Sequence, residues 1–352
     1  MKARFLLLGL VGALASAAPA WAAARDPRIP TRQQLKACPA FADVDFKGIY
    51  RDQDARPEAP VNDWRGRLDE RHAKTRGPYG AFEAPADAAI ALRIWAGGSE
   101  TQEYRTDTSS IVWLGADGVW RVNRVDHSTN RPLPPKPPPP PDEKGVSPPY
   151  VGWTQEEVER MQRTAMAGVL EPERAAGIEM ALADPCFQLQ PDAMPLQVPV
   201  RKGKPPRGPC YGVIGGTLEI RWADRRWRDV TELCGGFYAS GIISAVMYAR
   251  PYFEDEETRA QCDPLRAIAR ASLTPPQLRD LAFCEAGLMP EVRRNRLGEA
   301  ERDALHAEAA RLAPAAMPER YKYLSEWSAA ALAKAIRRLN PSLPKTEPAF
   351  SR

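Results

Sequence analysis

The stretch VWLGADGVWRVNRVD (residues 112–126) reverses the chain between two segments in which apolar and polar residues alternate. Asp117-Gly118 at its centre is a strong signal for a β-hairpin turn. A near copy, IRWADRRWRDVTEL (residues 220–233), repeats Ala-Asp, two further residues and then Trp-Arg. Since successive side chains of a strand point to opposite faces, this alternation is typical of half-buried strands. Both stretches are therefore predicted to be β-hairpins with four-residue turns.

The tryptophans of the two stretches lie next to the predicted turns: Trp113, Trp120, Trp222 and Trp227. Aromatic pairs across neighbouring strands help to fix strand register. The alternative is that each Trp-Arg pair forms an exposed platform for a sugar or another flat ring. Tryptophan at a strand end more often belongs to a core, so we interpret the repeated stretch as scaffold.

Further strands are predicted before the first hairpin. AIALRIWAG (residues 89–97) and TQEYRTDT (residues 101–108) alternate in polarity and are bounded by Gly, Asp and Ser. The polar sequence at residues 51–80 is interpreted as turn-rich.

Helical patterns dominate the chain after residue 150. Thr154 is a candidate N-cap followed by glutamates, which predicts a helix over residues 154–168. Pro172 near the start and Pro185 at the end delimit a second helix. Residues 262–284 are predicted to form a helix, a Thr-Pro-Pro turn and another helix. Two more helices follow at 298–313 and 319–339, the last with one apolar face: Tyr321, Leu324, Ala331, Leu332, Ala335 and Leu339.

Together these patterns predict an α+β protein in which antiparallel β-hairpins pack with helices and the C-terminal region is helical. The predicted organisation is a signal peptide at residues 1–22, an N-terminal β-rich region at 23–131, a Pro-rich linker or surface loop at 132–149, an α+β region with the second hairpin at 150–252, a helical region at 253–340 and a disordered tail at 341–352. Within the linker, PLPPKPPPPP is typical of a polyproline II spacer, with a ligand for an aromatic groove as the alternative.

The N-terminus predicts export. Lys2 and Arg4 precede an apolar run, and Ala20-Trp21-Ala22 supplies a small-x-small cleavage pattern, which together are typical of a secretory signal peptide. We therefore expect a periplasmic or secreted protein with no integral membrane segment after cleavage. The net charge of +4 over 352 residues is too small to steer the whole molecule to nucleic acid.

Six cysteines follow the predicted signal: Cys38, Cys186, Cys210, Cys234, Cys262 and Cys284. An even number in an exported chain, with no Cys-x-x-Cys spacing, predicts disulfides rather than zinc or redox chemistry. Sequence alone does not choose among the possible pairings. Our prediction pairs sequence neighbours, Cys210 with Cys234 and Cys262 with Cys284, and joins the two halves of the chain through Cys38 and Cys186.

No catalytic residue is predicted. His72 and His306 lie in charge-rich helical sequence that is typical of a solvated face, and His127 follows strand sequence. Asp126-His127-Ser128 contains the residue types of a catalytic triad, but neighbours on an extended chain point in opposite directions. No Gly-x-Ser-x-Gly motif supplies a nucleophile.

No metal or cofactor site is predicted either. DVDFKGIYRDQD (residues 43–54) partly follows a calcium loop, but Lys47 places a positive charge among the would-be ligands, so a turn with capping aspartates is favoured. No phosphate-binding glycine motif occurs, and CGGFYASG lacks the lysine that such a loop uses. A basic loop at residues 201–207 is interpreted as solvated.

These observations favour a non-enzymatic function. We expect an exported, disulfide-stabilised protein of the bacterial envelope that acts as a binding or structural module for an unknown envelope protein or polymer, without nucleic acid and without a cofactor. The alternative is a periplasmic or secreted hydrolase that uses paired acidic residues, whose separation in space no sequence reveals.

Overall fold

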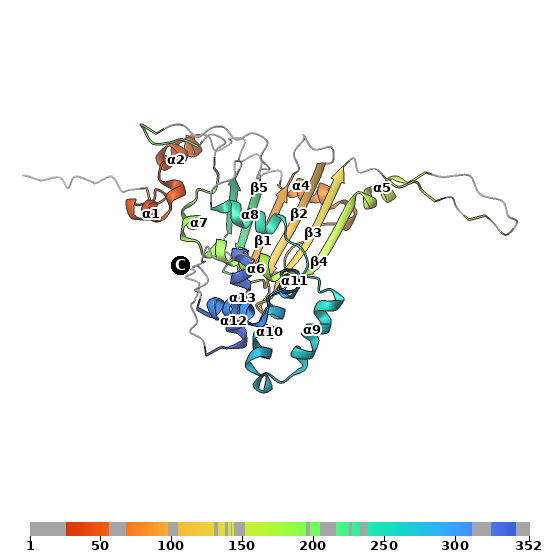
Figure 1. The fold of residues 1–352 in the computed structure, drawn as a ribbon. Helices are drawn as coiled ribbons and strands as arrows, with labels where there is room; N and C mark the ends of the chain where they lie inside the picture. Colours follow the sequence, from red (N-terminus) through yellow and green to blue (C-terminus); the bar gives the residue numbers. More distant parts are fainter. Residues whose placement is uncertain are drawn as a thin grey trace, which may run out of the picture.

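The structure is a computed structural model. It describes residues 26–55, 68–97, 105–129, 133–137, 140–141, 143, 152–194, 198–204, 216–224, 227–232, 238–311 and 325–342. The predicted signal peptide, much of the Pro-rich segment, Cys210, Cys234 and the predicted tail beyond residue 342 lie outside these residues. The described chain combines a six-stranded antiparallel sheet with helices and ends in a helical region (Figure 1), which confirms the α+β prediction.

Both predicted hairpins are confirmed, and a further strand joins them into one sheet. The sheet order is β4-β3-β2-β1-β5-β6, and all neighbouring strands are antiparallel. Strand β1, which pairs with β2 on one side and with β5 on the other, therefore links sequence from before and after the Pro-rich segment. The strand bounds are β1 Ile90–Ala96, β2 Arg105–Leu114, β3 Trp120–Thr129, β4 Arg163–Val169, β5 Gly216–Trp222 and β6 Trp227–Glu232.

The first hairpin turn is one residue longer than predicted. Leu114 pairs with Trp120, and Gly115 N–H donates to Val119 O at 3.0 Å, so residues 115–119 make the connection. Gly118 has a φ of +74°, which glycine adopts without strain. The Asp-Gly signal located the reversal correctly but not its length, because the cross-strand register also depends on the rest of the sheet.

The described helices begin with three that precede the sheet: α1 Arg32–Ala37, α2 Phe46–Ala55 and α4 Leu68–Arg76. Residues 42–43 do form a turn, but the turn predicted over residues 43–54 is wrong from Phe46 onward, where α2 begins. The turn-rich interpretation of residues 51–80 is wrong for residues 51–55 and 68–76, which are helical, and residues 56–67 lie outside the described ranges. Phe46 and Ile49, three residues apart, are both buried, so α2 is stabilised by packing that its polar sequence does not reveal.

The helices after β3 largely follow the prediction. They are α5 Gln155–Met161, α6 Pro172–Ala183, α7 Pro185–Leu189, α8 Ala239–Met247, α9 Glu256–Ala267, α10 Pro275–Glu285, α11 Met289–Arg294, α12 Glu299–Arg311 and α13 Glu326–Leu339. Thr154 caps α5 through a capping box. The helix predicted over 154–168 nevertheless ends at Met161, because the next residues pair with β3 as β4.

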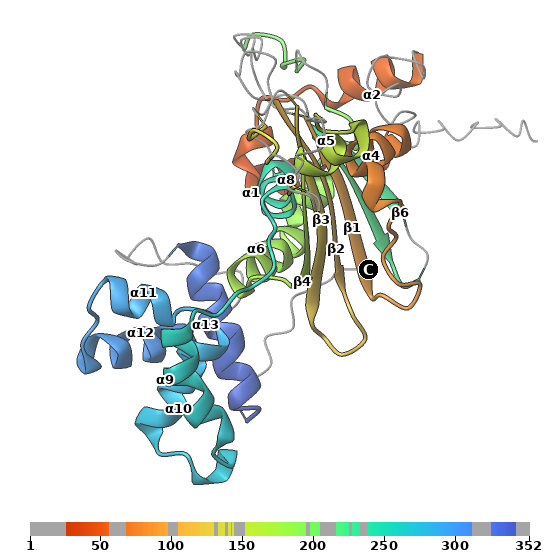
Figure 2. The ribbon, with the colours of Figure 1, turned by 90° about the vertical axis from the view of Figure 1, so that its right-hand side faces the viewer.

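The core lies on one face of the sheet, beneath α6 and α8 (Figure 2). Leu92, Val112, Val122 and Ile220 project from the strands into this layer and are fully shielded from solvent. Of the repeated tryptophans, Trp120 lies within this core and Trp222 packs against it, as expected for scaffold. Trp113 projects from the opposite face, where its ring lies 5.4 Å from that of Phe82.

The C-terminal helices form a second core. Alanines of α13 pack with Phe283 of α10, and α13 also contacts α6, which joins this region to the sheet. At that contact, a Cβ on Gly177 of α6 would lie 2.5 Å from the Trp327 ring, so the helices approach too closely for any other residue. Tyr321 and Leu324, predicted for the apolar face of α13, lie outside the described residues.

Two predicted disulfides are present. Cys38 and Cys186 join the N-terminal segment to α7 with Cα atoms 5.5 Å apart, and Cys262 and Cys284 join α9 to α10 at 5.7 Å. All four cysteines are buried. The Cys210–Cys234 pair falls outside the described residues and stays a prediction.

Residues 133–137 of the Pro-rich segment adopt no regular secondary structure and are attached to α5. Trp153 Nε1 donates to Pro134 O at 2.8 Å, and Lys136 pairs with Glu157 at 2.9 Å.

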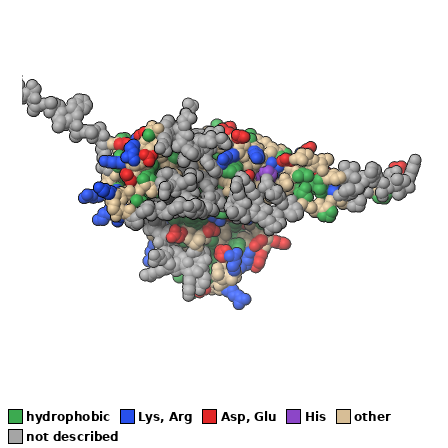
Figure 3. Space-filling view, turned by 90° about the horizontal axis from the view of Figure 1, so that it is seen from above, with side chains coloured by type: hydrophobic (Ala, Val, Ile, Leu, Met, Phe, Trp, Pro, Cys, Tyr) green, Lys and Arg blue, Asp and Glu red, His purple; other side chains and the backbone are tan. Residues whose placement is uncertain are grey.

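No helix in the described ranges is long and apolar enough to cross a membrane. In the view from above, basic side chains gather at the end of the molecule that carries α1 and α2 (Figure 3).

Candidate functional site

Helix α4 covers part of the sheet face opposite the core, and this interface is unexpectedly polar. His72, Thr75 and Arg76 of α4 are all buried. Thr75 Oγ1 accepts a hydrogen bond from Trp95 Nε1 at 2.9 Å, and Arg76 Nη2 donates to Asn123 Oδ1 at 2.7 Å. The prediction that His72 lies on a solvated face is therefore wrong, because the sheet offers hydrogen-bonding partners that allow a polar helix to be buried.

The imidazole of His72 is deeply buried in this interface. Its Nδ1 lies 2.7 Å from Ser109 Oγ, and its Nε2 has no hydrogen-bond partner. Burial, together with the smaller effect of the positive charges of Arg93 and Arg76, lowers the pKa of His72 to about 3. The ring is therefore neutral at physiological pH.

Arg163 at the start of β4 holds the C-terminal end of α4. Its guanidinium donates to the carbonyl oxygens of Thr75 at 2.8 Å and Lys74 at 3.0 Å, where the helix dipole favours a positive charge. Gly77 follows with a φ of +48°, and a Cβ there would lie 2.8 Å from the guanidinium. Glycine therefore lets the chain turn away from α4 without positive-φ strain and without displacing the Arg163 guanidinium.

We predict that Gly77→Ala lowers the free energy of unfolding by about 1–3 kcal/mol, through positive-φ strain and the clash with Arg163. Urea denaturation measures this loss. Gly118→Ala is the control for positive-φ strain alone, since Gly118 has a φ of +74° and a Cβ added there would meet no heavy atom within 4 Å. Equal losses in the two variants would show that the Arg163 contact contributes nothing.

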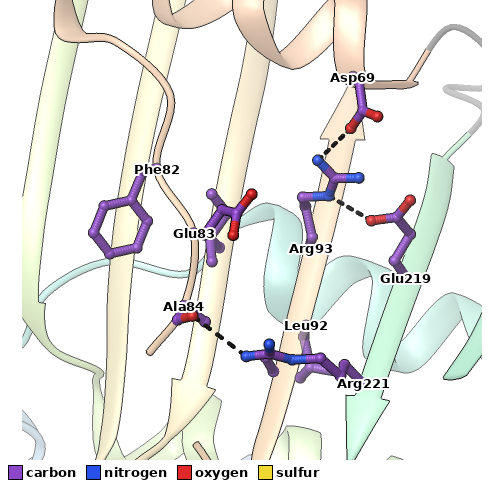
Figure 4. Close-up of a pocket in the computed structure, with 10 residues that line it drawn as sticks. Asp69, Phe82, Glu83, Ala84, Leu92, Arg93, Glu219 and Arg221 are labelled. Carbon is purple, nitrogen blue, oxygen red and sulfur yellow. Dashed lines mark hydrogen bonds and ion pairs between the residues drawn. The ribbon is translucent and has the colours of Figure 1, made fainter. Parts of the chain in front are cut away.

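Beside α4, the same sheet face is open and forms a pocket of about 280 Å³. Its floor is made by side chains of β1, β2 and β5, and its walls by α4 and by the segment that follows α4 (Figure 4). The residues that line it are Asp69, Phe82, Glu83, Ala84, Ala91, Leu92, Arg93, Ile111, Glu219 and Arg221.

Arg93 organises one side of the pocket. Its guanidinium forms ion pairs with Glu219 and, at 2.6 Å, with Asp69, so it lies between two carboxylates. Burial raises the pKa of the Glu219 carboxyl, and this effect outweighs the opposing influence of Arg93. Since the Glu219 side chain is only 12% exposed and that of Asp69 is 83% exposed, the network runs from the sheet to the solvent.

The other side of the pocket is formed by an aromatic ring, and two arginine side chains contact the segment that carries this ring. The Phe82 ring packs against Trp113, and Arg76 lies 5.7 Å from its centroid. Arg221 Nη2 donates to Pro85 O at 2.9 Å and to Ala84 O at 3.3 Å, which attaches this segment to β5. An aromatic ring thus faces a charged network across a small open cavity.

The histidines singled out in the sequence do not converge. His127 is buried on β3 opposite Asp107, while His306 lies half-buried on α12 in the C-terminal region. Asp126 and Ser128 project from the face of β3 opposite to that of His127, and Asp126 pairs with Arg124 at 2.8 Å. Within the described part of the chain, no three His, Cys, Asp or Glu side chains are placed to hold a metal ion.

Sequence reasoning missed the pocket residues, although one signal was available. Arg93 is the single charged residue of β1, whose other residues are apolar and buried. A charge in such a strand requires a partner, because an unpaired buried charge is costly. That partner, Glu219, lies 126 residues away and could not be identified from spacing.

Comparison with known proteins yields no match to a family model, a curated protein or a solved structure. The function must therefore be argued from the chemistry of the pocket itself.

Proposed function

We propose that this protein is an exported binding protein of the bacterial envelope whose pocket holds one unit of a polar envelope polymer. The observation that carries the proposal is the open cavity in which Phe82 faces the Arg93–Glu219–Asp69 network. Buried disulfides support the compartment, since such bonds persist where the environment is oxidising.

The lining favours a ligand that is rich in hydroxyl or amide groups and carries little charge. Three carboxylates and two guanidinium groups line the cavity, so their formal charges sum to −1, and Arg93 forms ion pairs with two of the carboxylates. The pocket therefore offers hydrogen-bond donors and acceptors without a strong net field. Phe82 adds an apolar surface on which one face of a sugar ring can pack.

The size of the cavity favours a single unit over a large free ligand. Its volume of about 280 Å³ lies near the lower end of the range for small-molecule pockets. Because the pocket is open to solvent at Asp69, the remainder of a polymer can extend outward without a clash.

The hydrolase alternative is supported by one observation. Glu219 has a raised pKa, as a general acid requires, and Asp69 and Glu83 supply further carboxylates in the same cavity. Against it, Arg93 binds both Glu219 and Asp69, which is the arrangement of a structural ion-pair network. Binding is therefore the function that this geometry supports better.

Calorimetric titration of the whole protein with short fragments of peptidoglycan, chitin and anionic wall polymers tests the proposal. We expect the fragments that carry little charge to bind and the anionic polymers not to bind, and we expect Phe82→Ala or Arg221→Gln to weaken the affinity of the bound fragment at least ten-fold. Arg121→Gln is the control, because Arg121 pairs with Asp117 in the hairpin turn and lies outside this pocket.

Three outcomes separate the possibilities. Binding that is lost only in the two pocket variants supports the proposed function. Turnover of a fragment that disappears in Glu219→Gln establishes the hydrolase instead. If no fragment binds, or if Arg121→Gln weakens binding as much as the pocket variants do, the proposal is wrong.

A further inference from the structure

Strand β4 is an edge of the sheet and is unusually unprotected. Thr164, Ala165, Ala167, Gly168 and Val169 are exposed, and no charged side chain occurs between Arg163 and Glu171. Proteins usually shield such edges with charges, proline or a covering segment, because the unpaired backbone groups attract other strands. Figure 2 looks onto this edge from the side.

The backbone hydrogen bonds show which groups of β4 point outward. Ser128 N–H donates to Gln162 O at 2.8 Å and Leu170 N–H donates to Trp120 O at 2.9 Å, so the even-numbered residues of β4 face β3. The backbone N–H and C=O groups of Ala165 and Ala167 therefore face away from the sheet. No other strand in the described part of the chain pairs with them.

One end of this edge is closed. Tyr252 N–H donates to Val169 O at 2.6 Å, and Pro251 forms a bridge with Leu170. Among the described residues, the part of the outer edge that has no backbone partner is therefore limited to Arg163 through Ala167 and the N–H of Val169. Only a short extended segment can be accommodated.

An apolar surface adjoins the closed end. Val169 is 49% exposed and Phe253 is 82% exposed, and the hydrogen bond of Tyr252 brings the two residues together. A strand added to β4 would thus find apolar contacts at its end.

We propose that the outer edge of β4 binds a short, extended, uncharged segment of a partner protein by strand addition, with an apolar side chain of that segment against Val169 and Phe253. Backbone hydrogen bonds to Ala165 and Ala167 provide the pairing. The alanine side chains are small, which leaves room on that face for larger cross-strand neighbours such as valine.

A second copy of the chain fits this edge less well. In an antiparallel pairing centred on Met166, Gln162 of the second copy would fall opposite Leu170, where Pro251 already lies. Moving the centre toward Ala165 brings the α5 helix of the second copy against Tyr252. A segment without such flanking structure meets neither obstacle.

The test uses the full chain and a fluorescent probe peptide, acetyl-Val-Thr-Val-Thr-Val-amide, followed by anisotropy. Two further peptides carry N-methyl groups on either the odd or the even residues. Because an added strand directs only alternate N–H groups toward β4, we expect one methylated peptide to bind as the parent does and the other to bind at least ten-fold more weakly.

Ala167→Pro in the protein removes an outward N–H but spares the hydrogen bonds to β3. We therefore expect this variant to bind the parent peptide at least ten-fold more weakly than the wild type does. Phe253→Ser, at a highly exposed site, is expected to lower the affinity for the parent peptide several-fold. Equal binding of the two methylated peptides would overturn the proposal whatever the variants do. Sedimentation that shows a dimer of the wild-type chain, abolished by Ala167→Pro, would also overturn it and assign the edge to a second copy.

Discussion

Replacing both Cys38 and Cys186 by serine is expected to lower the free energy of unfolding by about 5 kcal/mol, the largest loss for any disulfide of the described chain. The two cysteines are separated by 148 residues, so their bond removes much of the conformational freedom of the unfolded chain. Both also belong to a small core with Phe41 and Phe46 that holds the N-terminal segment against α7. Loss of the bond is therefore expected to release this segment first.

Urea denaturation of the double variant measures the loss. The double replacement of Cys262 and Cys284 is the matched control, because its loop of 22 residues predicts a smaller loss of about 3 kcal/mol. An ordering in which the control loses more would contradict the loop-length argument. Free thiols at Cys38 and Cys186 in the purified protein would contradict the exported compartment as well.

Acid is expected to destabilise the protein through His72. The pKa of this imidazole is 6.5 in an unfolded chain and about 3 in the folded protein. Because the pKa of His72 is lower in the folded protein than in the unfolded chain, the unfolded chain takes up a proton first as the pH falls. The contribution of His72 to the free energy of unfolding is therefore complete above pH 6.5 and is lost as the pH falls toward 3. At pH 5 the expected loss is about 2 kcal/mol, since each pH unit below 6.5 costs about 1.4 kcal/mol.

The measurement compares free energies of unfolding at pH 7 and pH 5 in the wild type and in His72→Asn, which places an amide near the Nδ1 position that contacts Ser109. We expect the difference between the free energies of unfolding at pH 7 and at pH 5 to be about 2 kcal/mol smaller in the variant than in the wild type. Burial also lowers the pKa of His306, but this ring is only half-buried, so His306→Asn is expected to change the difference less. An unchanged pH dependence in His72→Asn would show that this imidazole is solvated in the protein.

Local patterns predicted the elements whose signals lie within a few residues. The alternation around Asp117-Gly118 predicted the first hairpin, and Thr154 predicted the start of α5, because turn and capping interactions are made by near neighbours. The same reasoning failed for residues 163–169. There, pairing with β3 outweighed a helical start that a capping box had already provided.

The candidate site was not predictable in this way. Asp69, Arg93 and Glu219 come from α4, β1 and β5, and none of the three belongs to a motif. The interpretation of His72 as solvated failed for a related reason. A charge-rich helix is normally exposed, and only the hydrogen-bonding groups of the facing sheet make its burial possible.

By itself, the sequence determined the class of fold, the two chain reversals and the cysteines available for cross-linking, because these depend on local backbone preferences and on composition. Only the tertiary structure decided that β1 lies between the hairpins, that Arg93 meets Glu219 and that no described strand pairs with the outer edge of β4. Each of these depends on contacts between residues far apart in the chain. Such contacts form when the burial of apolar surface and the pairing of polar groups are satisfied together across the whole molecule.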